Sequence, residues 1–294
     1  MELSGVFVPL VTPFSPNQGV NPVSLRTLAE DVLAEGAAGV VALGTTGEPA
    51  TLTAEERKEV VAVLRDLPLI VGVGSNSTAA TEAEVAALPA GVVAMVVVPP
   101  YTRPGEAGVL AHFRKITKAA NGPVIAYHVP YRTGQALSTE ALLELAAIPG
   151  VDGMKLSDGA ITGGTVALLA DVPKDFAILG GDDAVISPLL AIGAHGGILA
   201  SAHICTSAFV QLHKAWRDGD TATARDLGPR LAELSEALFA EPNPAVVKAV
   251  LHAQGRIPTP AVRLPLLPAS PAARDRALLL ADRPRWDRGL AAHA

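Results

Sequence analysis

The feature that most constrains the fold of this 294-residue chain is a regular alternation of short apolar runs with longer helical segments. The runs recur roughly every 25–35 residues, and each is almost uniformly apolar, as parallel strands buried on both faces are. We therefore predict eight strands, at Gly5–Val11, Gly39–Leu43, Leu69–Val73, Val92–Val98, Pro123–Tyr127, Val151–Lys155, Phe176–Leu179 and Gly196–Ala200.

The segments between these runs are predicted to be helices. Helical periodicity marks Ser24–Glu35, Thr53–Leu64, Glu106–Ala120 and Ser138–Ala147. Several of these segments begin with Ser or Thr, and the first residues of the second one, from Thr53 to Glu56, have the spacing of a capping box.

Eight strands that alternate with helices predict an α/β protein with a (β/α)8 barrel, the TIM barrel, over residues 1–225. Residues 226–294 contain helical stretches and Pro-rich turns, and we predict a C-terminal helical domain there. A doubly wound sheet is the alternative fold. It is less favoured because Gly72-Val73-Gly74 lacks the third glycine of a GxGxxG motif.

Charge and composition restrict the partners and the compartment. A net charge of -6 and a pI near 5.6 argue against nucleic acid or an anionic membrane as a partner. The single cysteine, Cys205, precludes an internal disulfide and fits a reducing cytoplasm. The N-terminus lacks the pattern of a signal peptide, and prolines interrupt the longest apolar stretch before it could span a bilayer. We therefore expect a cytoplasmic protein.

Lys155 ends one of the apolar runs and is the strongest candidate for a catalytic residue. Burial disfavours the charged form of a lysine, so that its amine becomes nucleophilic near neutral pH. Such an amine can attack a ketone and form a Schiff base. The alternative is a lysine whose stem packs while its ammonium group reaches water.

A (β/α)8 barrel would bring further polar residues to the same place, because its active site lies at the carboxyl ends of the strands. The second strand is followed by Gly44–Gly47, where backbone N–H groups and the hydroxyls of Thr45 and Thr46 can bind a small carboxylate. The fifth strand ends in Tyr127, which can transfer protons, and the next loop carries Arg132, which can bind a second carboxylate.

Each of these residues also has a plain structural interpretation. The glycine-rich segment can be an ordinary turn with a Thr helix cap, and Tyr127 can bury its ring with a satisfied hydroxyl. Arg132 can be a solvated surface residue. The prediction of an active site therefore depends on the convergence of these residues with Lys155 at one mouth of the barrel.

Four motifs carry a family resemblance. They are Gly44–Glu48, Tyr127–Gly134, Gly153–Lys155 and Glu241–Pro244. Together they resemble the dihydrodipicolinate synthase / N-acetylneuraminate lyase family of class I pyruvate aldolases, and they are closest to its dihydrodipicolinate synthases. The similarity continues in the same order over nearly the whole chain, from Gly5 to Pro265.

The resemblance implies a lyase in which Lys155 forms a Schiff base with pyruvate. The resulting enamine would attack an aldehyde, and Tyr127 would transfer protons through Thr45 to Tyr101. Thr45 and Thr46 would hold the pyruvate carboxylate. Neither a metal nor an organic cofactor is required.

Other parts of the site and the assembly also follow from the resemblance. It implies a homotetramer of two tight dimers, in which Tyr101 reaches in from a neighbouring subunit. We add Gly181 and Leu199 to the predicted substrate-binding residues. The glycines of Gly180–Asp183 would let the chain pass close to the bound imine, whereas the two carboxylates there would repel a phosphate.

Arg132 indicates the second substrate, because it resembles the arginine that dihydrodipicolinate synthases use for L-aspartate semialdehyde. This implies condensation of pyruvate with that aldehyde, in lysine biosynthesis. His128 and Leu156 depart from the family pattern and leave open a related aldolase or dehydratase that acts on a 2-keto-3-deoxy sugar acid or another aldehyde. A third hypothesis is a non-catalytic relative that binds a keto acid as a sensor.

The resemblance also bears on regulation. In lysine-regulated synthases a tyrosine and a glutamate help to form the inhibitor site, and here Pro100 and Ala80 take their places, with only Asn76 kept. The ammonium group of lysine would find no carboxylate or aromatic partner. We therefore expect that lysine does not inhibit this protein.

Overall fold

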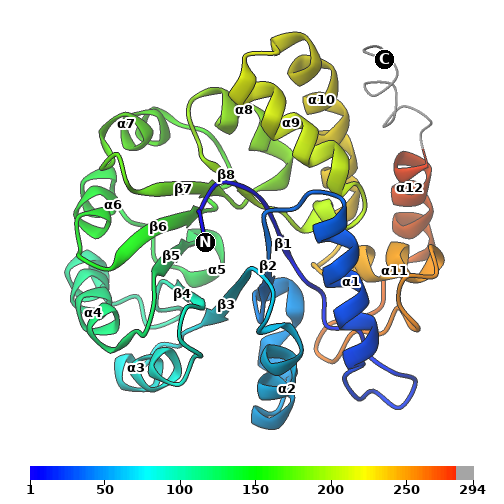
Figure 1. Cartoon of the computed structure of the whole chain (residues 1–294), viewed down its shortest axis with the longest axis horizontal. Coiled ribbons are helices and arrows are strands. Elements are labelled where there is room, and N and C mark those ends of the chain that lie inside the picture. Colours follow the sequence, from blue (N-terminus) through cyan, green and yellow to red (C-terminus); the bar gives the residue numbers. More distant parts are fainter. Residues whose placement is uncertain (283–294) are drawn as a thin grey trace.

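The computed structural model describes residues 1–282 and shows a closed barrel of eight parallel strands in sequential order. The strands form a ring, and the helices that connect them lie around it (Figure 1). The α/β fold and the (β/α)8 barrel predicted from the sequence are confirmed. The strands are β1 (Gly5–Pro9), β2 (Gly39–Ala42), β3 (Leu69–Val73), β4 (Val93–Val97), β5 (Val124–His128), β6 (Val151–Leu156), β7 (Ala177–Gly180) and β8 (Gly196–Ile198).

All eight predicted strands are present, with ends that differ from the prediction by at most two residues. The largest differences are at β1 and β8, where the strands end two residues earlier than predicted. β8 stops because Ala200–His203 turns into a 3-10 helix, η4. β1 stops at Pro9, and two residues later Val11 N–H donates to the His203 ring instead of to a neighbouring strand.

Two of the four predicted helices begin at the polar residue expected from the sequence, Thr53 and Ser138. The other two are preceded by Asn21 and Pro104, and so begin earlier than the predicted starts at Ser24 and Glu106. The side chain of Thr53 accepts a hydrogen bond from Glu56 N–H, and Glu56 binds the Thr53 N–H in return, so the predicted capping box is formed. The helices of the barrel are α1 (Pro22–Ala34), α2 (Ala54–Leu64), α3 (Thr78–Ala86), α4 (Gly105–Ala119), α5 (Pro130–Thr133), α6 (Thr139–Ala146), α7 (Gly163–Asp171), α8 (Ile186–Ala191) and α9 (Thr206–Asp218).

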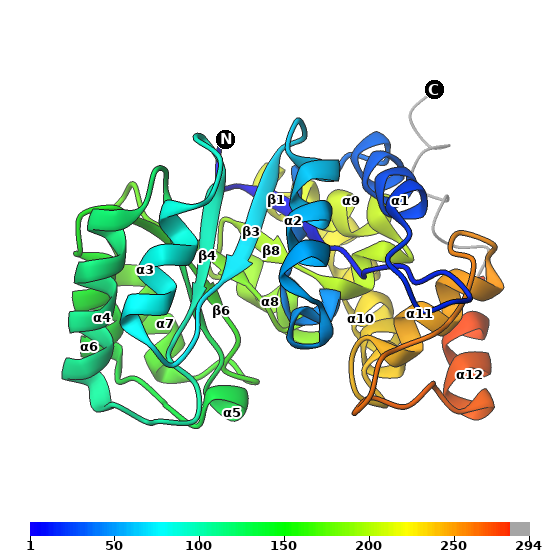
Figure 2. The same cartoon turned by 90° about the horizontal axis from the view of Figure 1, so that it is seen from below.

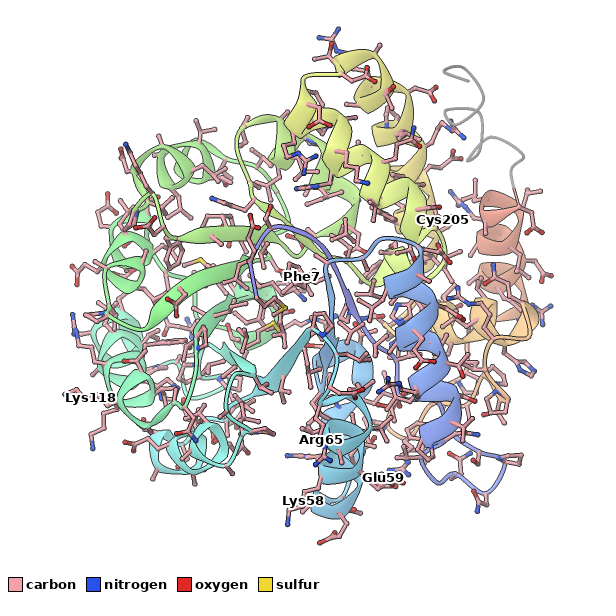
Figure 3. All side chains as sticks on the ribbon, viewed as in Figure 1. Phe7, Lys58, Glu59, Arg65, Lys118 and Cys205 are labelled. Atoms are coloured by element: carbon pink, nitrogen blue, oxygen red, sulfur yellow. The ribbon has the colours of Figure 1, made fainter. Side chains whose placement is uncertain are left out.

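Apolar side chains fill both the inside of the barrel and the layer between the barrel and its helices. The inner cluster includes Phe7, Val41, Ile70, Met95, Ile125, Leu179 and Ile198. Figure 3 shows Phe7 at the centre of the ring of strands, with the charged residues Lys58, Glu59 and Lys118 on the outer helices. The barrel is therefore a packed core, and free space for a ligand is confined to its ends.

Up to residue 282, three further helices follow the barrel, α10 (Thr221–Leu238), α11 (Ala245–Ala253) and α12 (Pro271–Ala281). Figure 1 and Figure 2 place α11 and α12 beside the barrel, on the side of α1 and α10. The predicted boundary between residues 225 and 226 falls inside α10, and the division into two domains stays a prediction. The last part of that division, residues 283–294, lies outside the described residues.

The two ends of the barrel differ. In Figure 2 the N-terminus lies at one end, where the strands begin, and α5 lies at the opposite end. Because α5 follows β5 directly, this opposite end carries the carboxyl ends of the strands. The candidate catalytic residues predicted from the sequence all lie at or just after strand ends that face this side.

A buried histidine joins the last strand of the barrel to the first. His203 Nε2 accepts a hydrogen bond from Val11 N–H at 3.1 Å, and Nδ1 lies 2.9 Å from the Ala200 carbonyl oxygen. The neutral ring with its proton on Nδ1 satisfies both contacts. Burial lowers the pKa of His203 to about 4, because protonation would put a second donor against the Val11 N–H.

We predict that His203 makes the protein sensitive to acid. Its pKa is lower in the folded state than in the unfolded chain, so its contribution is fully present above pH 6.5 and is lost as the pH falls toward 4. Between pH 7 and pH 5 this loss should be about 2 kcal/mol of unfolding free energy. Urea unfolding of wild type and His203→Gln at both pH values measures it. The variant should lose less stability than wild type, and equal losses would contradict the prediction.

Candidate active site

The register of two neighbouring strands places Lys155 beside Tyr127. In the β5–β6 pair these two residues are direct partners, each one position before the end of its strand. Lys155 Nζ lies 4.4 Å from the centroid of the Tyr127 ring. Both side chains are 7% exposed. The lysine is therefore buried against a phenol, as the hypothesis of a nucleophilic amine requires. Its amine does not extend into bulk water.

Gly181 leaves the space that the Lys155 side chain occupies. A Cβ atom at position 181 would lie 2.6 Å from Lys155 Cε and would overlap Ser157 Oγ. Only a residue without a side chain fits there. The chain after β7 therefore passes close to the Lys155 side chain, and its proximity to a bound imine stays a prediction.

Two carboxylates follow Gly181 at the same strand end. Asp183 is buried, and its Oδ2 accepts a hydrogen bond from Ser201 N–H at 2.6 Å. Burial raises the pKa of Asp183 to about 6, and the Ser201 hydrogen bond and the positive charge of Lys155 oppose this shift. Burial also raises the pKa of Asp182, which accepts a hydrogen bond from Gly159 N–H.

The glycine-rich segment after β2 forms a compact turn. Its centre is the 3-10 helix η1 (Thr45–Gly47), where Gly47 N–H donates to the Gly44 carbonyl oxygen. Thr45 is exposed and Thr46 is buried. Thr46 Oγ1 accepts a hydrogen bond from Asn243 Nδ2 at 2.9 Å, so the hydroxyl hydrogen of Thr46 remains free to donate to a ligand.

Arg132 and Tyr101 lie on adjoining loops at the edge of this end. Arg132 is exposed on α5, with its guanidinium carbon 5.6 Å from the Tyr131 ring centroid, and its charge acts on Asp182. Tyr101 N–H donates to the Thr133 carbonyl oxygen, which ties the two loops together. The Tyr101 side chain is 89% exposed, and its backbone is left-handed with φ 69°. Within one chain this tyrosine therefore projects outward.

The remaining predicted residue, Leu199, is placed differently. Its side chain is 1% exposed and belongs to the apolar cluster between the barrel and the helices, with Ile186 and Leu189. The structure thus brings Gly181 against Lys155 and puts the Leu199 side chain into the packing layer. A substrate contact of Leu199 stays a prediction.

His128 follows Tyr127 and points away from the lysine, as strand alternation predicts. Its side chain is 2% exposed, and Nε2 lies 3.1 Å from Asp158 Oδ1.

Among residues 1–282 no group of three or more His, Cys, Asp or Glu side chains could hold a metal ion. None of the helices in the same range has the length and apolarity needed to span a membrane.

Sequence reasoning missed several buried polar groups beside Lys155 and along the turn after β2. Ser157 is fully buried, and its Oγ has no hydrogen-bond partner among the described residues. Asp183, Asn243 and the buried pair of Glu48 with Lys248 were not identified either. Glu48 and Asn243 lie inside motifs that carried the family resemblance, which was a usable signal. No sequence signal marked Lys248, because its partner Glu48 is 200 positions away in sequence.

Comparisons with known proteins agree with this geometry. The model of the dihydrodipicolinate synthetase family matches residues 2–280. The 4-hydroxy-tetrahydrodipicolinate synthase of Methanothrix thermoacetophila is 38% identical over 271 residues, which are 90% of this chain and 92% of that protein. The enzyme of the same name from Neisseria gonorrhoeae is also 38% identical, over 273 residues, covering 90% of this chain and 93% of that one.

Solved structures give the same result. The chloride-inhibited dihydrodipicolinate synthase of Acinetobacter baumannii, complexed with pyruvate, superposes with a TM-score of 0.88 at 35% identity. The match covers 95% of this chain and 99% of that one. A monomeric dihydrodipicolinate synthase variant has a TM-score of 0.88 at 31% identity, with 94% and 95% of the two chains covered.

We predict that Gly181→Ala disables the lysine without unfolding the barrel. The new methyl group would displace the Lys155 side chain, and a shift of about 1 Å can cost roughly 100-fold in rate. The measurement is the rate at which borohydride traps a keto acid on Lys155. The matched control is Gly163→Ala at the start of α7, where a Cβ would meet no atom within 4 Å. Equal trapping rates for the two variants would contradict the prediction.

Proposed function

Because this chain belongs to the dihydrodipicolinate synthetase family, we propose that it condenses pyruvate with L-aspartate semialdehyde through a Schiff base at Lys155. The observation that carries the proposal is the burial of the Lys155 amine against the Tyr127 ring, 4.4 Å away. This is the reaction of a 4-hydroxy-tetrahydrodipicolinate synthase, the name of the relatives above, and it places the protein in lysine biosynthesis.

The chemistry starts at the lysine amine. Lys155 Nζ attacks the ketone carbon of pyruvate, and the carbonyl oxygen leaves as water to give a protonated imine. The imine withdraws electrons, so a proton leaves the pyruvate methyl group and an enamine forms. The enamine carbon then forms a bond to the aldehyde carbon of the second substrate, whose carbonyl oxygen takes up a proton. The amine of that substrate attacks the imine carbon, and Lys155 leaves as the free amine. Tyr127, the ring nearest to the amine, transfers protons in these steps, with Thr45 and Tyr101 as its relay.

The turn after β2 supplies the site for the pyruvate carboxylate. The Thr46 hydroxyl has its hydrogen free, since its oxygen already accepts from Asn243. Thr45 adds a second hydroxyl at the exposed edge of the turn. Two hydroxyl donors and the N–H groups of a glycine-rich turn suit a carboxylate, which only accepts hydrogen bonds. Gly181 has no side chain, so Lys155 can keep the position from which it reaches the keto acid.

Arg132 supports the choice of the second substrate. It is exposed at the entrance, on α5, where a carboxylate of the incoming aldehyde can bind its guanidinium group in a bidentate manner. The exposed Tyr101, on the loop that binds α5, is positioned to reach a neighbouring subunit. We therefore propose a homotetramer of tight dimers, in the cytoplasm, with small-molecule substrates.

One observation favours a second candidate function. The hydroxyl of Ser157 is buried beside the Lys155 side chain, and no described residue satisfies it. A hydroxyl-rich acceptor could use this group, because an unpaired buried hydroxyl gains a hydrogen bond from a polar ligand. The second candidate is thus a pyruvate-dependent aldolase or dehydratase that acts on a 2-keto-3-deoxy sugar acid or a related aldehyde.

Trapping with borohydride tests the Schiff base. Wild-type protein incubated with pyruvate and reduced should gain one pyruvate-derived adduct in intact mass, mapped by peptide digestion to Lys155. The Lys155→Ala variant should remain folded, form no adduct, and lose at least about 1,000-fold in turnover, because it lacks the nucleophile. An unmodified wild type would support the sensor hypothesis and contradict the proposal.

Arg132→Ala separates the two acceptor classes. If Arg132 binds the carboxylate of L-aspartate semialdehyde, turnover should fall roughly 10- to 100-fold, while imine formation with pyruvate stays near the wild-type rate. Turnover with sugar aldehydes, measured in parallel, should be low in both proteins. If turnover of the Arg132→Ala variant with L-aspartate semialdehyde is unchanged, the assignment of the protein as a synthase is contradicted.

Lysine is expected not to inhibit the enzyme. Ala80 is exposed and Pro100 is half-buried, and neither side chain offers a charge or an aromatic ring to an ammonium group. Initial rates with pyruvate and L-aspartate semialdehyde should stay within error of the uninhibited rate up to millimolar lysine. Half-inhibition at a lysine concentration below about 1 mM, a concentration typical of metabolite binding, would contradict this expectation.

A further inference from the structure

A fully buried ion pair connects the C-terminal helices to the turn at the active site. Lys248 Nζ on α11 lies 2.7 Å from Glu48 Oε1, and both side chains are 0% exposed. Burying two charges costs solvation free energy, and an apolar pair of similar volume often gives equal or greater stability. The pair therefore needs an explanation other than stability alone.

The backbone of Glu48 indicates what the pair does. Glu48 is the residue that ends the turn after β2, and its φ of 54° and ψ of 40° are left-handed, a conformation that residues with side chains rarely adopt. Glu48 N–H donates to the Thr45 carbonyl oxygen, so this conformation belongs to the turn itself. A residue held in such a conformation needs fixed partners for its side chain.

Both carboxylate oxygens of Glu48 have such partners, and both partners come from the C-terminal region. Oε1 accepts from Lys248 Nζ, and Oε2 accepts from Arg263 N–H at 2.8 Å. No oxygen is left over for proton transfer at the site. Glu48 therefore acts as an anchor and not as a base.

The position of Lys248 is fixed in turn. Its Nζ lies 3.9 Å from the centroid of the Phe14 ring, which holds the ammonium group from a second side. Burial lowers the pKa of Lys248 to about 8, and the charge and hydrogen bond of Glu48 oppose this shift. Five positions before Lys248, Asn243 donates to Thr46 Oγ1. One short segment thus contacts the turn at two residues, Thr46 and Glu48.

We infer that Lys248 is a positioning residue that acts through Glu48 to set the geometry of the carboxylate-binding turn at Thr45 and Thr46. The inference rests on the proposed function, because it takes that turn as the site of the pyruvate carboxylate. It assigns the C-terminal helices a part in substrate binding: α11 touches no reacting atom, yet it determines where the two hydroxyls lie. Loss of the pair should weaken pyruvate binding more than it slows the later chemistry.

The test uses the double variant Glu48→Gln/Lys248→Met, which removes both charges and leaves neither one buried alone. Wild type and variant are trapped with borohydride over a range of pyruvate concentrations. The concentration for half-maximal adduct formation should rise about tenfold or more, whereas the rate at saturating pyruvate should fall by less than about threefold. The Lys248→Arg variant keeps the charge, so its half-saturating pyruvate concentration should lie between those of the wild type and the double variant.

Two controls separate this role from a structural tether. Arg26→Met removes the ion pairs of α1 with Glu30 and Asp66, away from the turn, and should leave the half-saturation unchanged. Urea unfolding of the same proteins reports stability. If the double variant keeps the wild-type half-saturation, whether or not its stability falls, the pair has no part in pyruvate binding and the inference is overturned.

A single variant keeps the test decisive if the double variant does not fold. Glu48→Gln retains an oxygen that can accept from Lys248, so its fold should persist, and its half-saturation should rise roughly threefold to tenfold. An unchanged value would overturn the inference. A wild type that forms no adduct would instead contradict the proposed function, so the two failures are distinguishable.

Discussion

The structure depends on the burial of one amine at the end of β6. Lys155 is placed there by strand pairing, which fixes Tyr127 directly opposite it, and a closed barrel allows no slippage of that register without turning every side chain to the other face. Solvent exclusion around the amine is completed by the backbone at Gly181, which has no side chain to compete for the space. The nucleophile is thus created by the packing of three consecutive strands.

The charged residues near Lys155 are carboxylates at the strand end and an arginine on the exposed side. The chain as a whole is acidic, with a net charge of -6, and two of its carboxylates, Asp182 and Asp183, lie at the strand end next to Lys155. Burial raises the pKa of both carboxyl groups, to about 6 for Asp183, so both bind a proton more readily than an exposed carboxylate does. Arg132, on the exposed side, supplies positive charge at the entrance instead.

The C-terminal helices contribute to the site through the turn after β2. Lys248 on α11 and Asn243 in the loop before α11 contact it, and the backbone N–H of Arg263 adds a third hydrogen bond. Arg263 also forms an ion pair with Glu56 at the start of α2, which joins the same region to the barrel. A site at the mouth of a barrel is therefore supported by residues that lie outside the eight βα units.

The sequence by itself determined the barrel, because eight buried runs at regular spacing leave few other folds, and it identified Lys155 and Tyr127 as candidate catalytic residues, because both end predicted strands. Only the tertiary structure decided which buried polar groups lie beside Lys155 and along the turn after β2. Ser157, Asp183 and the pair of Glu48 with Lys248 show no periodicity or spacing, since their contacts join segments far apart in the chain. Local patterns record which face of an element is buried, but the identity of the partner across a buried contact depends on how the elements pack.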